Sequence, residues 1–97
     1  MATYVALVNF TDQGIRQIKQ TTERAKNLVN AAANLGVNVK EIYWTMGAYD
    51  AVFIADAPND EAVTSLALSM GSLGNIRTQT MRAYTAEEIN KILARLP

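Results

Sequence analysis

The sequence contains neither cysteine nor histidine. The lack of cysteine excludes disulfides and thiolate metal sites, and the lack of histidine removes the commonest metal ligand and the usual base near neutral pH. Basic and acidic residues are equal in number, nine of each, so no net charge attracts nucleic acid or an acidic membrane. We therefore expect no metal, no cofactor and no nucleic-acid partner.

Long apolar runs are also missing, since none approaches the ~20 residues that a membrane helix requires. The start, Met1 to Tyr4, lacks the basic and apolar regions of a signal peptide. We expect a cytoplasmic protein without membrane contact, built as a single domain over residues 1–97. A chain of this size buries roughly two thirds of its unfolded surface, so association would help its modest core.

Four segments have the composition or alternation of β-strands. Thr3–Phe10 and Asp50–Ala55 are apolar on both faces, which predicts central strands covered on both sides. Val37–Met46 changes phase at Lys40-Glu41, which predicts a bulge in an edge strand. Asn75–Ala83 is rich in polar residues and is predicted as the other edge strand.

Helical spacing of apolar residues predicts three helices. The first is expected as one helix from about Gln13 to Leu35, capped by Thr11 or Asp12. The second begins near Asn59 or Asp60 and stops near Gly71, and Thr85 with Glu88 forms a capping box that opens the third, which ends at Arg95. The apolar residues of this last helix are predicted to face inward: Ile89, Ile92, Leu93 and Leu96.

The predicted order is therefore βαββαβ followed by a C-terminal helix, which is the ferredoxin-like α+β pattern. In that topology the first and third strands are central, in agreement with their two-sided apolar character. Two helices cover only one face of such a sheet. The simplest cover for the other face is a second copy of the chain, so we predict a homodimer or a higher homo-oligomer.

A β-hairpin is predicted from Tyr43 to Asp50, which holds three of the aromatic residues, including the only tryptophan. The strand should run to Met46, with a two-residue type II′ turn at Gly47-Ala48 and a second strand from Tyr49. The first position of such a turn requires a positive φ, which glycine adopts without strain.

The segment Gly47-Ala48-Tyr49-Asp50 resembles the motif of the GYD domain family. The resemblance extends over most of the chain, and its other matching segments are Phe10–Ile15, Ala57–Ala62, Gly71–Thr78 and Arg82–Tyr84. It implies a ferredoxin-like domain of the dimeric α/β-barrel group. That group includes cofactor-independent monooxygenases, isomerases, haem enzymes and small-ligand sensors, so the fold does not select a function.

Asp50 and Tyr49 are the candidate catalytic residues. Asp50 is either a general base or substrate anchor among aromatic side chains, or a turn carboxylate that accepts backbone hydrogen bonds of the hairpin. Candidate ligand-binding residues are Asn9, Trp44, Tyr49, Asp50 and Arg77, where the aromatic side chains line a pocket or fill a core and Arg77 holds an anion or protects a sheet edge.

Two further features have a structural interpretation. Gly14 lies in the first turn of a predicted helix, where glycine is unfavourable unless another part of the chain approaches closely. Met46, Met70 and Met81 are predicted as core filler.

Two classes of function remain open. The first is a homo-oligomeric module that binds a small ligand or another protein. The second is a cofactor-independent enzyme that acts on a small apolar or aromatic substrate. The lack of histidine and cysteine favours the first class, because acid–base chemistry would otherwise depend on Asp50 and tyrosines.

Overall fold

A computed structural model describes all 97 residues and contains four strands, four α-helices and one short 3-10 helix. The strands are β1 (Ala2–Phe10), β2 (Asn38–Trp44), β3 (Ala51–Ala57) and β4 (Ile76–Ala83), and the helices are α1 (Asp12–Arg16), η1 (Ile18–Gln20), α2 (Thr21–Asn34), α3 (Asp60–Ser72) and α4 (Ala86–Leu93).

The strands form one antiparallel sheet in the order β2-β3-β1-β4. The central strands are β1 and β3 and the edge strands are β2 and β4, as their composition predicts. The ferredoxin-like α+β fold is confirmed. The register of β2 against β3 shifts between Val39 and Glu41, so the predicted bulge is also confirmed.

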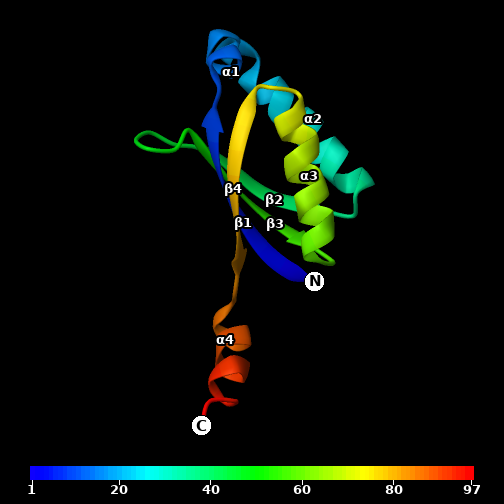
Figure 1. The fold of residues 1–97 in the computed structure, drawn as a ribbon, viewed down its shortest axis with the longest axis vertical. Coiled ribbons are helices and arrows are strands. Elements are labelled where there is room, and N and C mark those ends of the chain that lie inside the picture. Colours follow the sequence, from blue (N-terminus) through cyan, green and yellow to red (C-terminus); the bar gives the residue numbers. More distant parts are fainter.

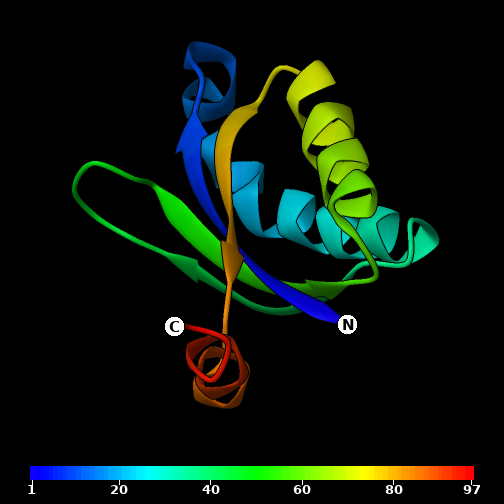
Figure 2. The same ribbon diagram turned by 60° about the horizontal axis from the view of Figure 1, so that its bottom comes forward.

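Helices α2 and α3 lie together on one side of the sheet, and the other side carries no helix (Figures 1 and 2). Side chains alternate between the two sides, as the strand geometry requires. The buried positions of β1 and β3, which include Ala6 and Phe53, face the helices. The uncovered side, which we call the open face, carries Thr3, Val5, Leu7 and Asn9 of β1, Glu41 and Tyr43 of β2, Val52, Ile54 and Asp56 of β3, and Arg77, Gln79 and Met81 of β4.

The core between the sheet and the helices is small. Only 13 of 97 residues are buried, and twelve of them form one cluster in which Leu66 and Val37 are the largest fully buried side chains. The radius of gyration is 14.6 Å, whereas a compact domain of this length has a value of about 12.5 Å. The chain is therefore extended for its size.

The predicted single helix over residues 13–35 is wrong, because the chain leaves helical geometry at Gln17 (φ −109°, ψ 30°). Thr11 caps α1 and ties its start to the turn before β4: its N–H donates to the Asn75 carbonyl at 3.1 Å and its hydroxyl to the Gly74 carbonyl at 2.5 Å. The helical periodicity of the sequence runs through this break, so the tertiary contacts of Thr11 and α1 outweigh it here.

The hairpin between β2 and β3 is present, but its predicted two-residue turn is wrong. The strands end at Trp44 and begin again at Ala51, and the Thr45 N–H donates to the Asp50 carbonyl at 2.9 Å across a longer loop. Asp50 donates its own N–H to the Val8 carbonyl of β1 at 2.8 Å, so its backbone bonds β1 on one side and Thr45, which follows β2, on the other. Gly47 does have a positive φ of 104°, as predicted.

Helix α3 ends at Ser72, close to Gly71 as predicted. The chain reversal that follows contains Gly74, whose φ is 84°. None of the helices combines the length and apolar character needed to cross a bilayer.

Helix α4 extends away from the body of the molecule at the end of β4 (Figures 1 and 2). Its predicted capping box is confirmed, since the side chains of Thr85 and Glu88 each bond the other's backbone N–H. Its apolar side chains do not face inward within the chain, however, because all are 38–62% exposed: Ile89, Ile92, Leu93 and Leu96. Because α4 extends away from the sheet and the other helices, its apolar side has no surface of the same chain to pack against.

Two methionines predicted as core filler are also exposed. Met46, in the hairpin loop, is 96% exposed, and Met81, on the open face, is 47% exposed. Met70 alone of the three packs against the core.

Candidate functional site

The candidate site is a mainly apolar cavity between the sheet and helices α2 and α3. It has a volume of about 260 Å³, and eleven of its 15 lining residues are hydrophobic. An engineered apolar cavity of about 150 Å³ holds benzene, so this cavity has room for one ring and a short substituent. Its apolar walls are Val8, Phe10, Ala25, Leu28, Ile42, Trp44, Ala51, Phe53, Met70, Leu73 and Ile76.

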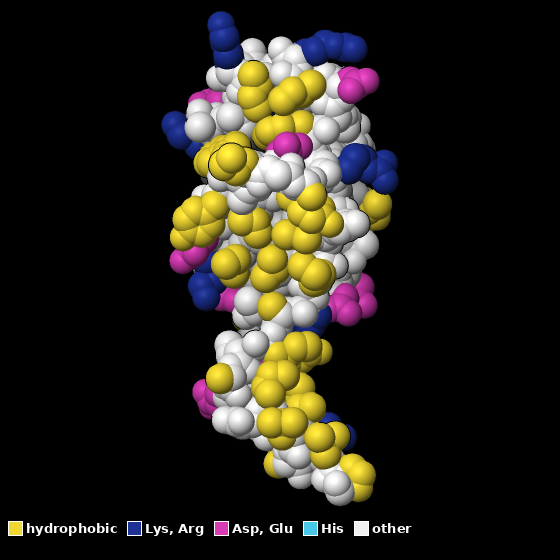
Figure 3. Space-filling model, turned by 90° about the vertical axis from the view of Figure 1, so that its left-hand side faces the viewer, with side chains coloured by type: hydrophobic (Ala, Val, Ile, Leu, Met, Phe, Trp, Pro, Cys, Tyr) yellow, Lys and Arg dark blue, Asp and Glu magenta, His cyan; other side chains and the backbone are white.

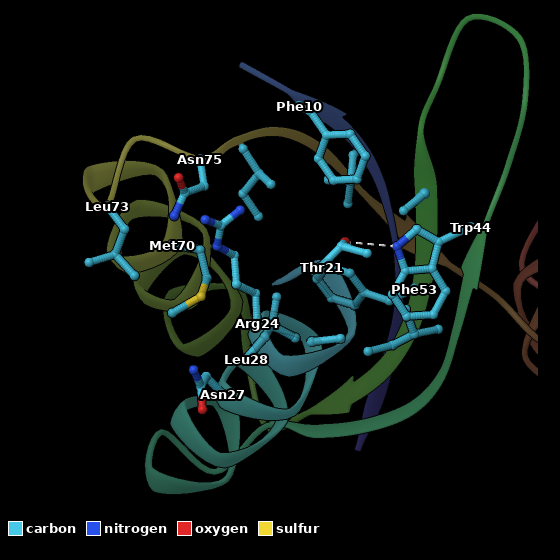
Figure 4. A pocket seen from close by; sticks show the side chains of 15 residues that line it. Phe10, Thr21, Arg24, Asn27, Leu28, Trp44, Phe53, Met70, Leu73 and Asn75 are labelled. Carbon is cyan, nitrogen blue, oxygen red and sulfur yellow. Dashed lines mark hydrogen bonds between the residues drawn. The ribbon is translucent and has the colours of Figure 1, made fainter. Parts of the chain in front are cut away.

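One wall of the cavity is fixed by a hydrogen bond between β2 and α2. The indole Nε1 of Trp44 donates to the hydroxyl of Thr21 at 3.0 Å (Figure 4). Trp44 sits opposite Ala51 in the β2–β3 register, and both line the cavity. The indole is 44% exposed, so it forms an edge of the opening and a bound molecule would cover it.

The polar lining of the cavity includes one cation. In Figure 4 the guanidinium of Arg24 and the amide of Asn75 lie on one side of the cavity, and the Trp44 ring lies on the other. Arg24 bonds only neutral oxygens, namely the carbonyl and side chain of Gln17 and the side chain of Gln20. None of the ion pairs in the chain involves it.

Asn75 presents a second donor beside this cation. Its Oδ1 accepts a hydrogen bond from the Gln13 amide at 2.8 Å, and its backbone carbonyl accepts from Thr11. No hydrogen bond uses its Nδ2 group within the chain. The cavity therefore combines apolar walls with a polar end that donates hydrogen bonds and carries positive charge.

Asp50 does not lie in this cavity. Its Oδ2 accepts the backbone N–H of Phe10 at 2.8 Å, so the carboxylate bonds a neighbouring strand and not the N–H groups of its own hairpin. The β1–β3 ladder ends at Val8 and Ala51, and the Asp50 side chain supplies the next acceptor along β1.

The other candidate residues divide between the two sides of the sheet. Trp44 faces the helices, whereas Tyr49 lies on the open side, where its hydroxyl donates to Gln79 of β4 at 2.8 Å. Asn9 and Arg77 are direct partners in the β1–β4 register and also belong to the open face. The structure thus groups Tyr49, Asn9 and Arg77 but separates them from Trp44.

Asn9 has an unusual environment on that face. Its Nδ2 donates to the Ala48 carbonyl at 3.3 Å, which holds the hairpin loop against β1, while its Oδ1 is buried without any partner. A buried acceptor without a donor is costly, roughly 1–3 kcal/mol. A group from outside the chain would relieve this cost.

A second polar cluster joins β4 to α3 and α4. The Tyr4 hydroxyl donates to Asp60 at 2.5 Å, and this hydrogen bond raises the pKa of Tyr4 above its usual value. Arg82 lies 5.8 Å from the Tyr4 ring and 4.4 Å from the Tyr84 ring, and it pairs with Glu88 at 3.1 Å. Since these charges satisfy one another, we interpret the cluster as a structural link to α4. No three side chains of the metal-binding types lie together anywhere in the chain.

The sequence interpretation missed Arg24 and Asn75. Thr21, Arg24 and Leu28 follow one another at intervals of three and four, so they share a face of α2. An arginine four residues before a buried leucine is therefore the sequence signal that a charged side chain lies beside the core. Asn75 lies outside the helices, in the turn before β4, and no spacing rule connects it to Arg24.

Comparisons with known proteins agree with this fold. The model of the GYD domain family matches residues 4–93. The "Glutamine synthetase and cystathionine beta-lyase binding protein" of Thermus thermophilus is 29% identical over 90 residues, which cover 92% of this chain and 95% of the relative. The crystal structure of TTHA0845, also from Thermus thermophilus, superposes with a TM-score of 0.58 at 26% identity and covers 89% of this chain and 96% of that one. With 90 of its 97 residues matched by the family model, the chain belongs to the GYD domain family.

Proposed function

We propose that this protein is a homo-oligomeric module that binds a small apolar ligand in the cavity between the sheet and helices α2 and α3. The observation that carries the proposal is the cavity itself, about 260 Å³ in volume and lined mainly by apolar and aromatic side chains. Small-ligand sites in proteins have this character, with few polar groups that fix the orientation of the ligand.

The lining favours binding over acid–base catalysis. Its polar members are Thr21, Arg24, Asn27 and Asn75, together with the indole N–H of Trp44. None of these groups exchanges a proton readily near neutral pH. A cofactor-independent enzyme would need a base at the cavity, and Asp50 is engaged with the Phe10 N–H elsewhere. We therefore rank the binding module above the enzyme.

Native mass spectrometry and thermal-shift screening of small apolar compounds test the ligand. Ala25 lines the cavity, so Ala25→Phe should fill it and remove both a bound mass and any ligand-induced stabilisation. Ala33 is an exposed residue of the same helix, and Ala33→Phe is the matched control that should keep both. Ligands that stabilise the wild type and Ala25→Phe equally would contradict the proposal.

The open face supports the homo-oligomer. Its central side chains Val5, Leu7, Val52 and Ile54 are apolar, and Figure 3 shows hydrophobic side chains over this face and along α4 on the same side of the molecule. The accessible surface is 6510 Å², whereas a compact monomer of 10.6 kDa exposes about 5,500 Å². We propose that a second copy covers this face and α4, in an interface that buries more than ~2,000 Å² in total.

Sedimentation velocity tests the assembly. The wild type should sediment as a dimer or a larger oligomer at micromolar concentration, and Leu7→Glu should shift it toward monomer, because the new charge lies at the centre of the face. Glu61→Gln changes an exposed charge at the start of α3, away from this face, and serves as the control. A folded monomeric wild type would contradict the homo-oligomer and leave the cavity proposal intact.

The name of the 29% identical relative supports a second candidate function, the binding of glutamine synthetase or cystathionine beta-lyase. Under this hypothesis the chain would migrate with purified glutamine synthetase or cystathionine beta-lyase in size-exclusion chromatography. Separate elution of all components at tens of micromolar would contradict it, and this outcome is independent of the ligand screen.

A further inference from the structure

We propose that the cavity selects small monocarboxylates that carry one apolar ring or a branched alkyl group, with the carboxylate held by Arg24 and Asn75. This inference rests on the proposed ligand-binding function and specifies its ligand. It depends on the arrangement of the lining, where the Arg24 guanidinium and the Asn75 amide lie on one side and the Trp44 ring lies on the other (Figure 4).

The first argument concerns charge. Arg24 is a permanent cation whose partners within the chain are all neutral oxygens. None of the four ion pairs in the chain includes it, so its charge has no anionic partner. It is only partly exposed and lines a mainly apolar cavity. Electrostatic attraction is stronger beside apolar walls than in water, so an anionic ligand gains more here than at a surface arginine.

The second argument concerns hydrogen-bond geometry. A guanidinium presents several N–H donors in a planar fork that matches a carboxylate. Asn75 adds a neutral donor, because Gln13 occupies its Oδ1 and leaves Nδ2 free of partners within the chain. Both groups donate and neither is an acid, so the site disfavours ligands whose polar end is a cation.

The third argument concerns size and shape. A cavity of about 260 Å³ exceeds the ~150 Å³ that holds benzene and lies below the usual range for drug-sized ligands. The remaining walls include Phe10, Trp44 and Phe53, which favour a flat apolar group. One ring with a carboxylate on a short chain fits these limits.

Trp44 provides a direct assay, because it is the only tryptophan and forms part of the cavity edge. The probes are benzoate, phenylacetate and 3-phenylpropanoate, each compared with its neutral amide. We expect at least one acid to change the Trp44 fluorescence in a saturable way and to bind about tenfold or more tightly than its amide, as a charged hydrogen-bonded pair predicts.

Variants of the two donor residues test whether they cause the preference for acids over amides. Arg24→Met should reduce acid binding by about tenfold or more and leave amide binding nearly unchanged, while Arg24→Lys should keep part of the preference. Asn75→Asp preserves shape and should repel the acids selectively. Arg16→Met is the control, since Arg16 is exposed in α1 and does not line the cavity.

The outcomes separate the two proposals. Amides that bind as tightly as the acids, or an acid preference that survives Arg24→Met in a folded variant, would overturn the carboxylate inference and keep the small-ligand function. If neither acids nor amides bind at millimolar concentration, the carboxylate inference is overturned. The function itself then fails only if the apolar compounds of the wider screen are also inactive.

Discussion

The carboxylate of Asp50 accepts the backbone N–H of Phe10 at 2.8 Å and so continues the β1–β3 ladder where the two backbones separate. Asp50, the acidic residue of the Gly-Ala-Tyr-Asp segment, thus bonds the end of β1, and Val8 and Phe10 of this strand line the cavity. We infer that Asp50 shapes the site indirectly, by fixing the strand that forms its wall.

Two substitutions at Asp50 test this role. Asp50→Ala leaves the Phe10 N–H without its acceptor and should lower the free energy of unfolding by roughly 1–3 kcal/mol. Asp50→Asn keeps an oxygen in place and should cost less than Asp50→Ala. Chemical denaturation measures both. An Asn variant more stable than the wild type at neutral pH, with a difference that closes in acid, would instead indicate an unfavourable buried charge and favour the enzyme.

Gly14 and Gly71 predict opposite effects for the same substitution. A Cβ at Gly14 would overlap the backbone carbonyl of Asn75, whereas a Cβ at Gly71 meets no atom within 4 Å. Gly14→Ala should therefore destabilise the protein by about 1–3 kcal/mol through overpacking against backbone. Gly71→Ala, inside α3, should stabilise it by about 0.5–1 kcal/mol.

Thermal unfolding of the two alanine variants decides the point. If Gly14→Ala were as stable as the wild type, the close packing of α1 on the turn before β4 would be refuted. This packing also positions Asn75, so Gly14→Ala should weaken ligand binding at the cavity more than Gly71→Ala does.

The sheet could be predicted from sequence because strand alternation records burial on both sides. Thr3–Phe10 is apolar in both phases, and in the structure one phase faces the helices and the other lies on the open face. The phase change at Lys40 likewise marks the bulge. These signals are local, and each strand carries its own.

The site could not be predicted in the same way, because it depends on contacts between distant segments. Arg24 and Asn75 line the same cavity because the chain bends at Gln17 and α1 packs on the turn before β4. The apolar periodicity continues across that bend and conceals it. For α4, periodicity identified the apolar side correctly, but no signal indicated that this side lacks a partner within the chain.

The hairpin loop provides a further test at Gly47, whose φ of 104° lies in the region that side chains rarely adopt. Gly47→Val should lower stability by roughly 1–3 kcal/mol, since a β-branched residue is strained there. No atom lies within 4 Å of an added Cβ, so the loss would come from backbone strain alone. Unchanged thermal stability would show that the loop adopts another conformation without cost.

The last prediction concerns the pH dependence of α4. Hydrogen bonds from the Thr85 backbone, then from Arg82, lower the pKa of Glu88 below its usual value. A carboxylate whose pKa is lower in the folded state stabilises the fold above its unfolded pKa of about 4.3, and that contribution disappears as the pH falls through the folded value. Acid should therefore release α4 from Arg82.

Hydrogen exchange of the α4 amides, measured from pH 6 down to pH 3, checks this expectation. Protection of residues 86–93 in the wild type should fall at the acid end of this range. Glu88→Gln keeps an oxygen for the capping box but removes the titrating charge, so its α4 should exchange faster at pH 6 and change less with pH. Equal pH profiles for the two proteins would mean that other groups control the helix. Because we propose that α4 lies within the homo-oligomer interface, the same acid transition should weaken association, and sedimentation of both proteins at pH 6 and pH 3 measures this effect.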